Sequence, residues 1–198
     1  MNSVLRKTLF GGLCAASLGA CVSAAADSSS YSGNNSNGYG HGHREATLAD
    51  KVRTGTPNSF GDINVPLGMG WIRATPCVSG PQTGAMGVHI ASPERLGDAV
   101  LDPYKPEALI YEPLGNGYYQ LVGVEFIVFA AKWAEANPGG PAPRVDGHLM
   151  NYVGAPNRYG LDPFYEVHVW AWENNPLGTF ADFNTRVTCE KAGKADNN

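Results

Sequence analysis

The sequence has few charged residues, few cysteines and none of the short motifs that identify a common type of active site. Charged residues make up 16% of the chain, and only four residues are cysteine. There is no G-x-S-x-G pentapeptide, no His-Glu-x-x-His and no Cys-x-x-Cys. Nucleophilic hydrolysis therefore has no candidate residue, and no helix-borne zinc-protease site or thiol redox motif is present. Any site must be assembled from residues that are scattered along the chain.

Acidic residues outnumber basic residues in this chain. The chain has 14 Lys and Arg against 18 Asp and Glu, a formal net charge of −4. Two of the basic residues, Arg6 and Lys7, belong to the leader described next, so the mature chain is more acidic still. An acidic chain without a basic run argues against nucleic acid or an anionic lipid surface as a partner.

The apolar stretch near the N-terminus, Thr8 to Ala20, is too short to cross a bilayer. It follows two basic residues and ends in Leu18-Gly19-Ala20-Cys21, which resembles a bacterial lipobox. Residues 1–21 are therefore predicted to be a lipoprotein signal peptide, with Cys21 acylated. The exported protein is then expected in the periplasm or at the outer membrane, attached to the membrane by lipid alone. The alternative is ordinary cleavage after Ala24-Ala25-Ala26 and fully soluble secretion.

The composition divides the rest of the chain. Between Ser28 and His43, twelve of sixteen residues are Ser, Gly or Asn, which is typical of a flexible tether. We therefore predict a tether over residues 22–46, one globular domain over residues 47–190 and a disordered tail over residues 191–198.

Export changes how the cysteines are interpreted, because thiols oxidise beyond the inner membrane. Cys14 lies in the leader and Cys21 is the predicted lipidation site, which leaves Cys77 and Cys189. We predict that these two form a disulfide that brackets most of the domain; two buried free thiols are the alternative. On the chain-entropy model, closing so long a loop stabilises the fold by roughly 4–5 kcal/mol.

The periodicity of the domain is mainly that of strands. Short helices are expected after Thr47, weakly after Ser59, and around Lys132 to Glu135. Strands are expected over 85–90, 107–111, 118–130 and 162–175. The predicted fold is an α+β single domain with a mainly antiparallel sheet and a few short helices, closed by one disulfide.

The 162–175 segment is the clearest of these strands. Side chains alternate along a strand, so Val167, Val169 and Ala171 are expected on one face, with His168 on the other. Glu166, Trp170 and Trp172 are expected to share the face of His168. In the 118–130 strand, Glu125 is a single carboxylate within an apolar run, and the same alternation puts Val122 with Val124, Phe126 and Val128.

Ionisable residues within buried strands need partners. His89, Glu125 and His168 come from three different predicted strands, and two imidazoles with one carboxylate are a ligand set for zinc, iron or copper. The alternatives are a structural hydrogen-bond network, in which Glu125 accepts from His168, and unrelated exposed side chains.

The neighbouring residues suggest further roles. Glu166 is a candidate general base, with a fourth ligand or a hydrogen-bond acceptor for an imidazole as alternatives. Trp170 and Trp172 are candidates to hold a small apolar or aromatic ligand. Arg158 is a candidate to hold an anionic ligand at the mouth of the site, with a loop ion pair as its alternative.

Several runs together resemble an uncharacterised family of bacterial secreted proteins and lipoproteins. The runs are Ala74–Pro81, Gly84–His89, Pro106–Pro113, Leu121–Phe126, Pro156–Leu161 and Phe164–Pro176. The resemblance extends from about Phe60 to Cys189 and includes His89, Glu125 and His168, whereas an amide residue is more usual at the position of His148. It implies an exported protein but no particular activity, substrate or cofactor.

The sequence thus predicts a tethered lipoprotein with a mononuclear metal site, and a metal-dependent enzyme is one form of this hypothesis. The other is a non-catalytic ligand-binding or structural protein of the cell envelope, in which the same residues form only a hydrogen-bond network.

Overall fold

The computed structural model describes residues 45–80 and 82–196. The predicted signal peptide, the acylation of Cys21 and most of the tether lie outside this range, so they stay predictions. Within the described residues, no helix combines the length and the apolar character needed to cross a membrane.

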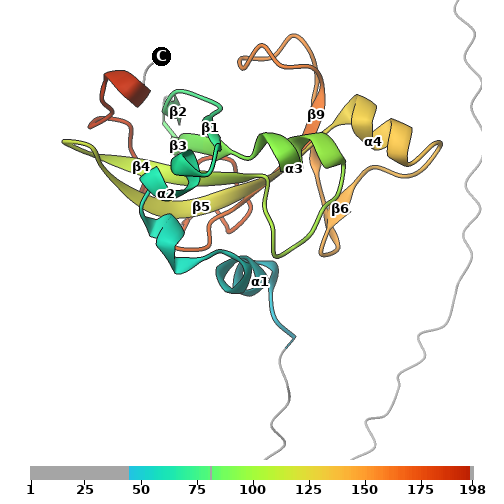
Figure 1. Ribbon diagram of the computed structural model, residues 1–198, viewed down its shortest axis with the longest axis horizontal. Helices are drawn as coiled ribbons and strands as arrows, with labels where there is room; N and C mark the ends of the chain where they lie inside the picture. The colour runs from blue at the N-terminus through green and yellow to red at the C-terminus, as the bar shows by residue number, and fades with distance from the viewer. Residues whose placement is uncertain (1–44, 81, 197–198) are drawn as a thin grey trace, which may run out of the picture. The chain divides into compact units, whose positions relative to one another are not determined.

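The described residues form an α+β domain with a mainly antiparallel sheet, as predicted (Figure 1). The elements in chain order are α1 (Leu48–Gly55), η1 (Asn58–Gly61), α2 (Asn64–Gly68), β1 (Ile72–Arg73), β2 (Val78–Gly80), β3 (Gly84–Ala91), α3 (Pro93–Asp98), β4 (Ala108–Gly115), β5 (Tyr118–Phe129), α4 (Ala130–Ala136), β6 (Arg144–Val145), β7 (His148–Leu149), β8 (Asn151–Val153), β9 (Phe164–Val169) and η2 (Lys194–Asp196).

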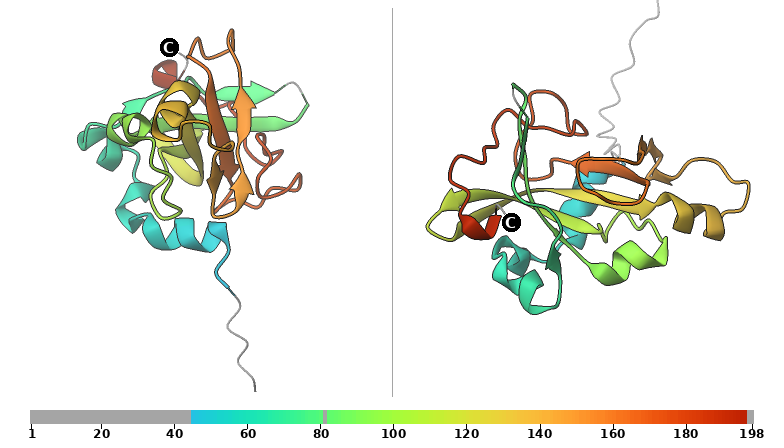
Figure 2. Two further views of the ribbon diagram at one scale, coloured as in Figure 1. Left: turned by 90° about the vertical axis from the view of Figure 1, so that its right-hand side faces the viewer. Right: turned by 90° about the horizontal axis from the view of Figure 1, so that it is seen from above.

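The main sheet has the order β1-β3-β4-β5-β9-β8, and β2 also pairs with β3. Its centre is the long β4–β5 hairpin, on which β3 lies at one side and β9 at the other. Figure 2, seen from above, shows the β2–β3 arm crossing this hairpin steeply. The sheet is therefore strongly twisted, which decides which side chains meet on its two faces.

One face of the sheet carries the larger core. Val124, Phe126 and Val128 of β5 pack there with Val167 and Val169 of β9, as the alternation predicted. Helix α1 covers this face through Leu48, Ala49 and Val52, and η1 adds Phe60. Thr47 begins α1 with a capping box, in which its hydroxyl accepts from the Asp50 backbone and the Asp50 carboxylate accepts in return.

The opposite face is covered in part by the C-terminal segment. Val187 packs there against Ala85, Ile110 and Val122, and the Asn184 backbone pairs with Ala85. The predicted disulfide between Cys77 and Cys189 is present and ties this segment to the residues just before β2.

A bulge changes the predicted faces of β5. Ile110 pairs with Gly123 but Tyr111 pairs with Leu121, so Val122 is the extra residue. The alternation reverses there, and Val122 lies with Ile110 on the second face instead of with Val124. The prediction that Val122 shares the face of Val124 was therefore wrong.

Three further expectations need correction. The strand expected over 162–175 is regular only over Phe164–Val169. Residues 141–160, for which no strand was expected, contain β6, β7 and β8. Within the predicted tail, residues 194–196 form η2, because the buried Asp196 side chain bonds Arg73 at 2.7 Å and Tyr119 at 2.7 Å, while residues 197 and 198 lie outside the described range.

Candidate metal centre

His89 lies on β3 with its ring on the second face of the sheet, and only 3% of the residue is exposed. Its Nδ1 is 2.9 Å from the Thr75 hydroxyl. Thr75 belongs to the link between β1 and β2, which runs beside β3 and whose Ala74 N–H donates to the His89 carbonyl. The edge of the sheet therefore holds the ring of His89 from its Nδ1 side.

Glu125 on β5 and His168 on β9 lie directly opposite each other in the antiparallel ladder. They are 7% and 2% exposed. Directly opposed residues on one face are the closest pairs that a sheet offers, so the register alone brings this carboxylate and this imidazole together.

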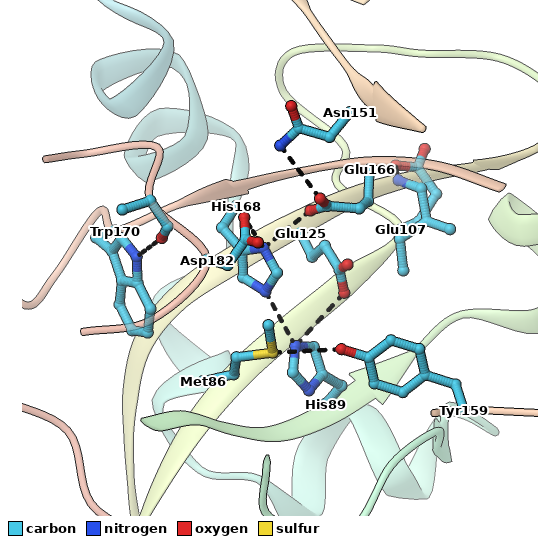
Figure 3. A network of polar contacts seen from close by, with 12 residues as sticks. Met86, His89, Glu107, Glu125, Asn151, Tyr159, Glu166, His168, Trp170 and Asp182 are labelled. Atoms are coloured by element: carbon cyan, nitrogen blue, oxygen red, sulfur yellow. Dashed lines mark hydrogen bonds and ion pairs between the residues drawn. The ribbon is translucent and has the colours of Figure 1, made fainter. Parts of the chain in front are cut away.

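The twist of the sheet brings His89 to the same place. Three strand spacings separate β3 from β9, about 14 Å on a flat sheet, which is too far for two imidazoles to touch. In the twisted sheet, His89 Nε2 lies 3.4 Å from His168 Nε2 and 3.4 Å from Glu125 Oε2 (Figure 3). Donor atoms of the three residues all lie within 4.8 Å of one another.

The other nitrogen of His168 is occupied by Glu166. His168 Nδ1 is 2.9 Å from Glu166 Oε2, and the Asn151 amide donates to Glu166 Oε1 at 3.3 Å. Asp182 Oδ1 lies further from Nδ1, at 4.0 Å. A carboxylate at Nδ1 accepts its N–H, which leaves the lone pair of Nε2 directed at His89 and Glu125.

Glu166 therefore lies on the far side of the His168 ring from the cluster of Nε2 and Oε2 atoms. Of the three roles that the sequence left open for Glu166, this position supports the hydrogen-bond acceptor. It does not place the carboxylate where a general base beside a shared ion would act, because the imidazole stands between them.

Burial and charge set the protonation of the cluster. Burial lowers the pKa of His89 to about 3, helped by the neighbouring His168. Burial also disfavours a charged His168, but the carboxylates of Glu125 and Glu166 outweigh it and raise the pKa of His168 to about 9. Burial raises the pKa of Glu125. The cluster thus favours one positive charge at its centre, either a proton or a metal ion.

The distances discriminate between these two occupants. Donors of a tetrahedral ion with bonds of about 2.0–2.1 Å lie about 3.3–3.4 Å apart, whereas adjacent donors of an octahedral ion lie about 2.8–3.0 Å apart. The two distances from His89 Nε2 to the other inner donors are 3.4 Å each, while the outer contacts to Thr75 and Glu166 are ordinary hydrogen bonds of 2.9 Å. The spacing around His89 Nε2 is therefore that of a small tetrahedral ion, and the donors of Glu125 and His168, which lie within 4.8 Å of each other, would move closer together to complete the set.

Two cavities border the cluster, and Tyr159 lines both of them. The first, about 320 Å³, has His89 and Glu125 on its wall, with Ile127, Phe129 and Leu161. The second, about 330 Å³, is lined by Glu125, Glu166 and His168 together with Arg158 and Asp182. Tyr159, Phe164 and Glu125 line both cavities.

The tryptophans do not line either cavity. Trp170 shares the face of His168, as predicted, but it is 4% exposed in the second core cluster, and its indole N–H donates to the Ala181 carbonyl at 2.6 Å. Trp172 packs against the first core cluster, because the regular pairing of β9 ends at Val169. Both border a separate open hollow of about 830 Å³ beside α1.

Arg158 does line the second cavity, as the sequence suggested. It is exposed, and it forms no ion pair with any described residue. His148 lies apart from the centre, and its ring packs against that of Phe180, with the ring centroids 4.1 Å apart and the planes tilted by 41°.

Sequence reasoning missed Thr75, Tyr159 and Asp182, all of which lie outside regular strands. Thr75 precedes Pro76 and Cys77, and its place two residues before the predicted disulfide was the one available signal. Tyr159 follows Arg158, which was selected, and no pattern distinguished it from the other tyrosines.

Comparison with protein-family models, with curated proteins and with solved structures found no match for this chain. The arguments for its function are therefore those of its own geometry.

Proposed function

We propose that this protein is an exported metalloprotein that holds one divalent transition metal, zinc in first place, through His89, Glu125 and His168. The observation that carries the proposal is the contrast between the two sets of distances. His89 Nε2 lies 3.4 Å from each of the other two donors, which is the donor spacing on a tetrahedral ion, and the donors of Glu125 and His168 lie within 4.8 Å of each other. The outer nitrogens of both imidazoles are hydrogen-bonded at 2.9 Å, so their inner nitrogens face the same point.

A metal-dependent enzyme is the form of the proposal that the ligand set favours. Three protein ligands with a fourth position open to a cavity are the pattern of catalytic zinc sites, whereas structural zinc sites use four protein ligands. Here the cluster borders two cavities. A metal in this position supplies Lewis-acid polarisation of a ligand oxygen, and the protein contributes a dry, shaped wall.

Among the metals, the geometry favours zinc over iron. Iron with two histidines and one carboxylate is usually six-coordinate with facial ligands, which requires the shorter spacing of about 2.8–3.0 Å between donors. The two distances from His89 Nε2 to the other inner donors are 3.4 Å each. Copper shares the preference for imidazole, and metal analysis separates it from zinc.

The second candidate is a non-catalytic domain in which a proton replaces the metal. The raised pKa of His168 favours it, since burial opposes the charge but Glu125 and Glu166 retain it. In that state the Nε2–H of His168 donates to His89 Nε2. The 3.4 Å separation is long for such a bond, whose usual range is about 2.7–3.2 Å, and this ranks the candidate second.

Export and lipid anchoring are part of the proposal. The leader with Arg6 and Lys7, the lipobox ending at Cys21 and the oxidised pair Cys77–Cys189 all support a location beyond the inner membrane. Metabolic labelling with a fatty acid tests it: wild type should be labelled and Cys21→Ser should not.

Metal analysis tests the centre. Protein prepared without a histidine tag, exposed to zinc and then dialysed, should retain about one zinc per chain. His168→Ala and His89→Ala should each abolish retention, while His148→Ala, which removes an imidazole elsewhere, should retain the metal. Folded wild-type protein that retains no transition metal would overturn the proposal.

A further inference from the structure

The cavity beside His89 and Glu125 has a chemistry that narrows the class of substrate. We propose that the centre acts on compounds in which a metal-binding oxygen group is attached to a compact apolar group of one or two rings. The apolar group occupies the cavity, and the oxygen group binds at the centre beside the Tyr159 hydroxyl. This inference rests on the proposed function, since it assigns the ligand of the same site.

The wall of this cavity is apolar away from the centre. Ile127, Phe129, Phe164, Ala91 and Leu96 line it. The polar groups on the wall are His89, Glu125 and Thr75 of the centre itself and the Tyr159 hydroxyl beside it, with one exception. A ligand bound there therefore has one polar end, directed at the centre, and no polar group elsewhere.

The exception is Arg73, and its charge is already neutralised. Its guanidinium bonds Asp196 at 2.7 Å and the Tyr119 hydroxyl at 3.3 Å, and it also lies against the Tyr119 ring. Since these partners hold the guanidinium, Arg73 offers the cavity its aliphatic part rather than a free cation. The cavity is thus not built for an anion.

The volume limits the size of the ligand. The cavity measures about 320 Å³, near the lower end of the range of about 300–1,000 Å³ for small-molecule sites. A dry apolar cavity of about 150 Å³ accommodates benzene, so this one suits one or two rings. Its border includes two exposed apolar side chains, Ile72 at 49% and Leu161 at 41%, which form an apolar entrance.

Tyr159 lines both cavities, and its hydroxyl points toward Met86 and the ring of His89 (Figure 3). That hydroxyl donates only to Met86 Sδ, at 3.5 Å, among the described residues. A thioether is a weak acceptor, so an incoming oxygen readily replaces it. Tyr159 is thus placed to donate a hydrogen bond to the oxygen group of the ligand, with the apolar group held on the His89 side.

Two hydroxamic acids and cobalt test this inference. Cobalt(II) replaces zinc in tetrahedral sites and gives visible absorption that changes when a ligand binds. In the cobalt-loaded protein, benzohydroxamic acid should bind at least about 10-fold more tightly than acetohydroxamic acid, because only its ring fills the cavity. Tyr159→Phe should weaken both probes several-fold without changing the cobalt content.

Leu161→Asp provides the specificity control, since it puts a charge at the entrance without entering the core. It should reduce the preference for the aromatic probe to about 3-fold or less, whereas Leu177→Asp, at a site 54% exposed and away from the cavity, should leave the preference unchanged. Ala74→Phe, which fills the cavity from an exposed position, should act like Leu161→Asp.

The outcomes distinguish the two proposals. If the protein takes up no cobalt and no zinc, the metal centre is wrong and this inference falls with it. If cobalt binds and both hydroxamic acids bind equally well, the metal centre stands and the substrate class is overturned. If the aromatic preference is found but survives both Leu161→Asp and Ala74→Phe, the ring binds elsewhere and the assignment of this cavity is overturned.

Discussion

The hydrogen bond between Glu166 and His168 fixes which nitrogen of the His168 ring faces the centre. They are two residues apart on β9, so their side chains share a face, and Glu166 Oε2 lies 2.9 Å from His168 Nδ1. The carboxylate holds the imidazole by one nitrogen and so presents the other to His89 and Glu125. Asn151 on the neighbouring strand β8 orients Glu166 in turn.

Changing Glu166 tests this positioning role. Glu166→Ala should weaken zinc binding about 10–100-fold, and Glu166→Gln less, since the amide oxygen still accepts from Nδ1. Competition with a chelator of known affinity measures both. Glu135→Gln, on the exposed side of α4, is the matched control and should not change the affinity.

The same pair of variants separates the acceptor role from the general-base role that the sequence suggested. A general base leaves zinc affinity intact when it is replaced by glutamine. If Glu166→Ala binds zinc as tightly as wild type, Glu166 does not position the ligand and the base hypothesis regains its place.

Thr75→Val should weaken zinc binding about 10-fold, because it removes the acceptor for the Nδ1–H of His89 while keeping the shape of the side chain. The fold should be unaffected, since Thr75 is not in the core. Thr185→Val, at an exposed position, is the control. The measurement is the same chelator competition, with near-ultraviolet circular dichroism to compare folding; unchanged affinity would remove Thr75 from the site.

The three proposed ligands could be selected from the sequence because they break a pattern. Glu125 interrupts an apolar strand, and His168 lies two residues from a second carboxylate within another strand. Buried ionisable groups require partners, so such interruptions point to one another. The register of β5 against β9 then puts Glu125 opposite His168, which alternation alone could not decide.

The parts that the sequence did not predict follow from irregular backbone. Period-two alternation assumes unbroken pairing, so it assigned Val122 to the wrong face at the bulge and assumed that Trp172 continues the face of Trp170. Loop residues such as Tyr159 carry no periodic signal. Trp170 lies on the predicted face, but alternation does not reveal that Val187 covers that end of the face, and the ligand-binding role of Trp170 stays a prediction.

The buried carboxyl group of Glu107 predicts that the stability of the fold depends on pH, independently of the metal centre. It is 1% exposed, its Oε2 accepts from the Ile127 N–H, and its Oε1 has no partner among the described residues. Burial raises its pKa to about 8, from 4.5 in the unfolded chain. Between these two values only the unfolded state loses the proton, so this residue lowers the stability as the pH rises.

The free energy of unfolding should fall by about 1.4 kcal/mol per pH unit between the two pKa values. The total loss above pH 8 is roughly 4–5 kcal/mol as an order of magnitude. Glu107→Gln keeps an acceptor for Ile127 and cannot ionise. Its stability should match wild type near pH 4 and exceed it by several kcal/mol at pH 8.5, measured by urea unfolding. Parallel pH profiles for wild type and variant, with Glu135→Gln as the exposed control, would show that the pKa of Glu107 is not raised and that its carboxylate ionises in the folded state as it does in the unfolded chain.

The disulfide stabilises the fold and also fixes the segment that holds Thr75 against His89. Cys77 is two residues from Thr75, and its N–H donates to the Asp196 carbonyl, so the bond to Cys189 fixes the link that carries Thr75 against His89. The bond closes a loop of 112 residues, for which the chain-entropy model gives about 4–5 kcal/mol. A Cys77→Ser, Cys189→Ser double variant should therefore unfold at a clearly lower temperature.

The double variant should also bind zinc several-fold more weakly at a temperature where it is still folded, because Thr75 then holds His89 less firmly. Adding Thr75→Val to it distinguishes this route from general loosening. If the disulfide acts through Thr75, the triple variant loses little further affinity. If the losses from Thr75→Val and from the missing disulfide simply add, the disulfide affects the centre by another path, and the link between β1 and β2 is not what transmits its effect.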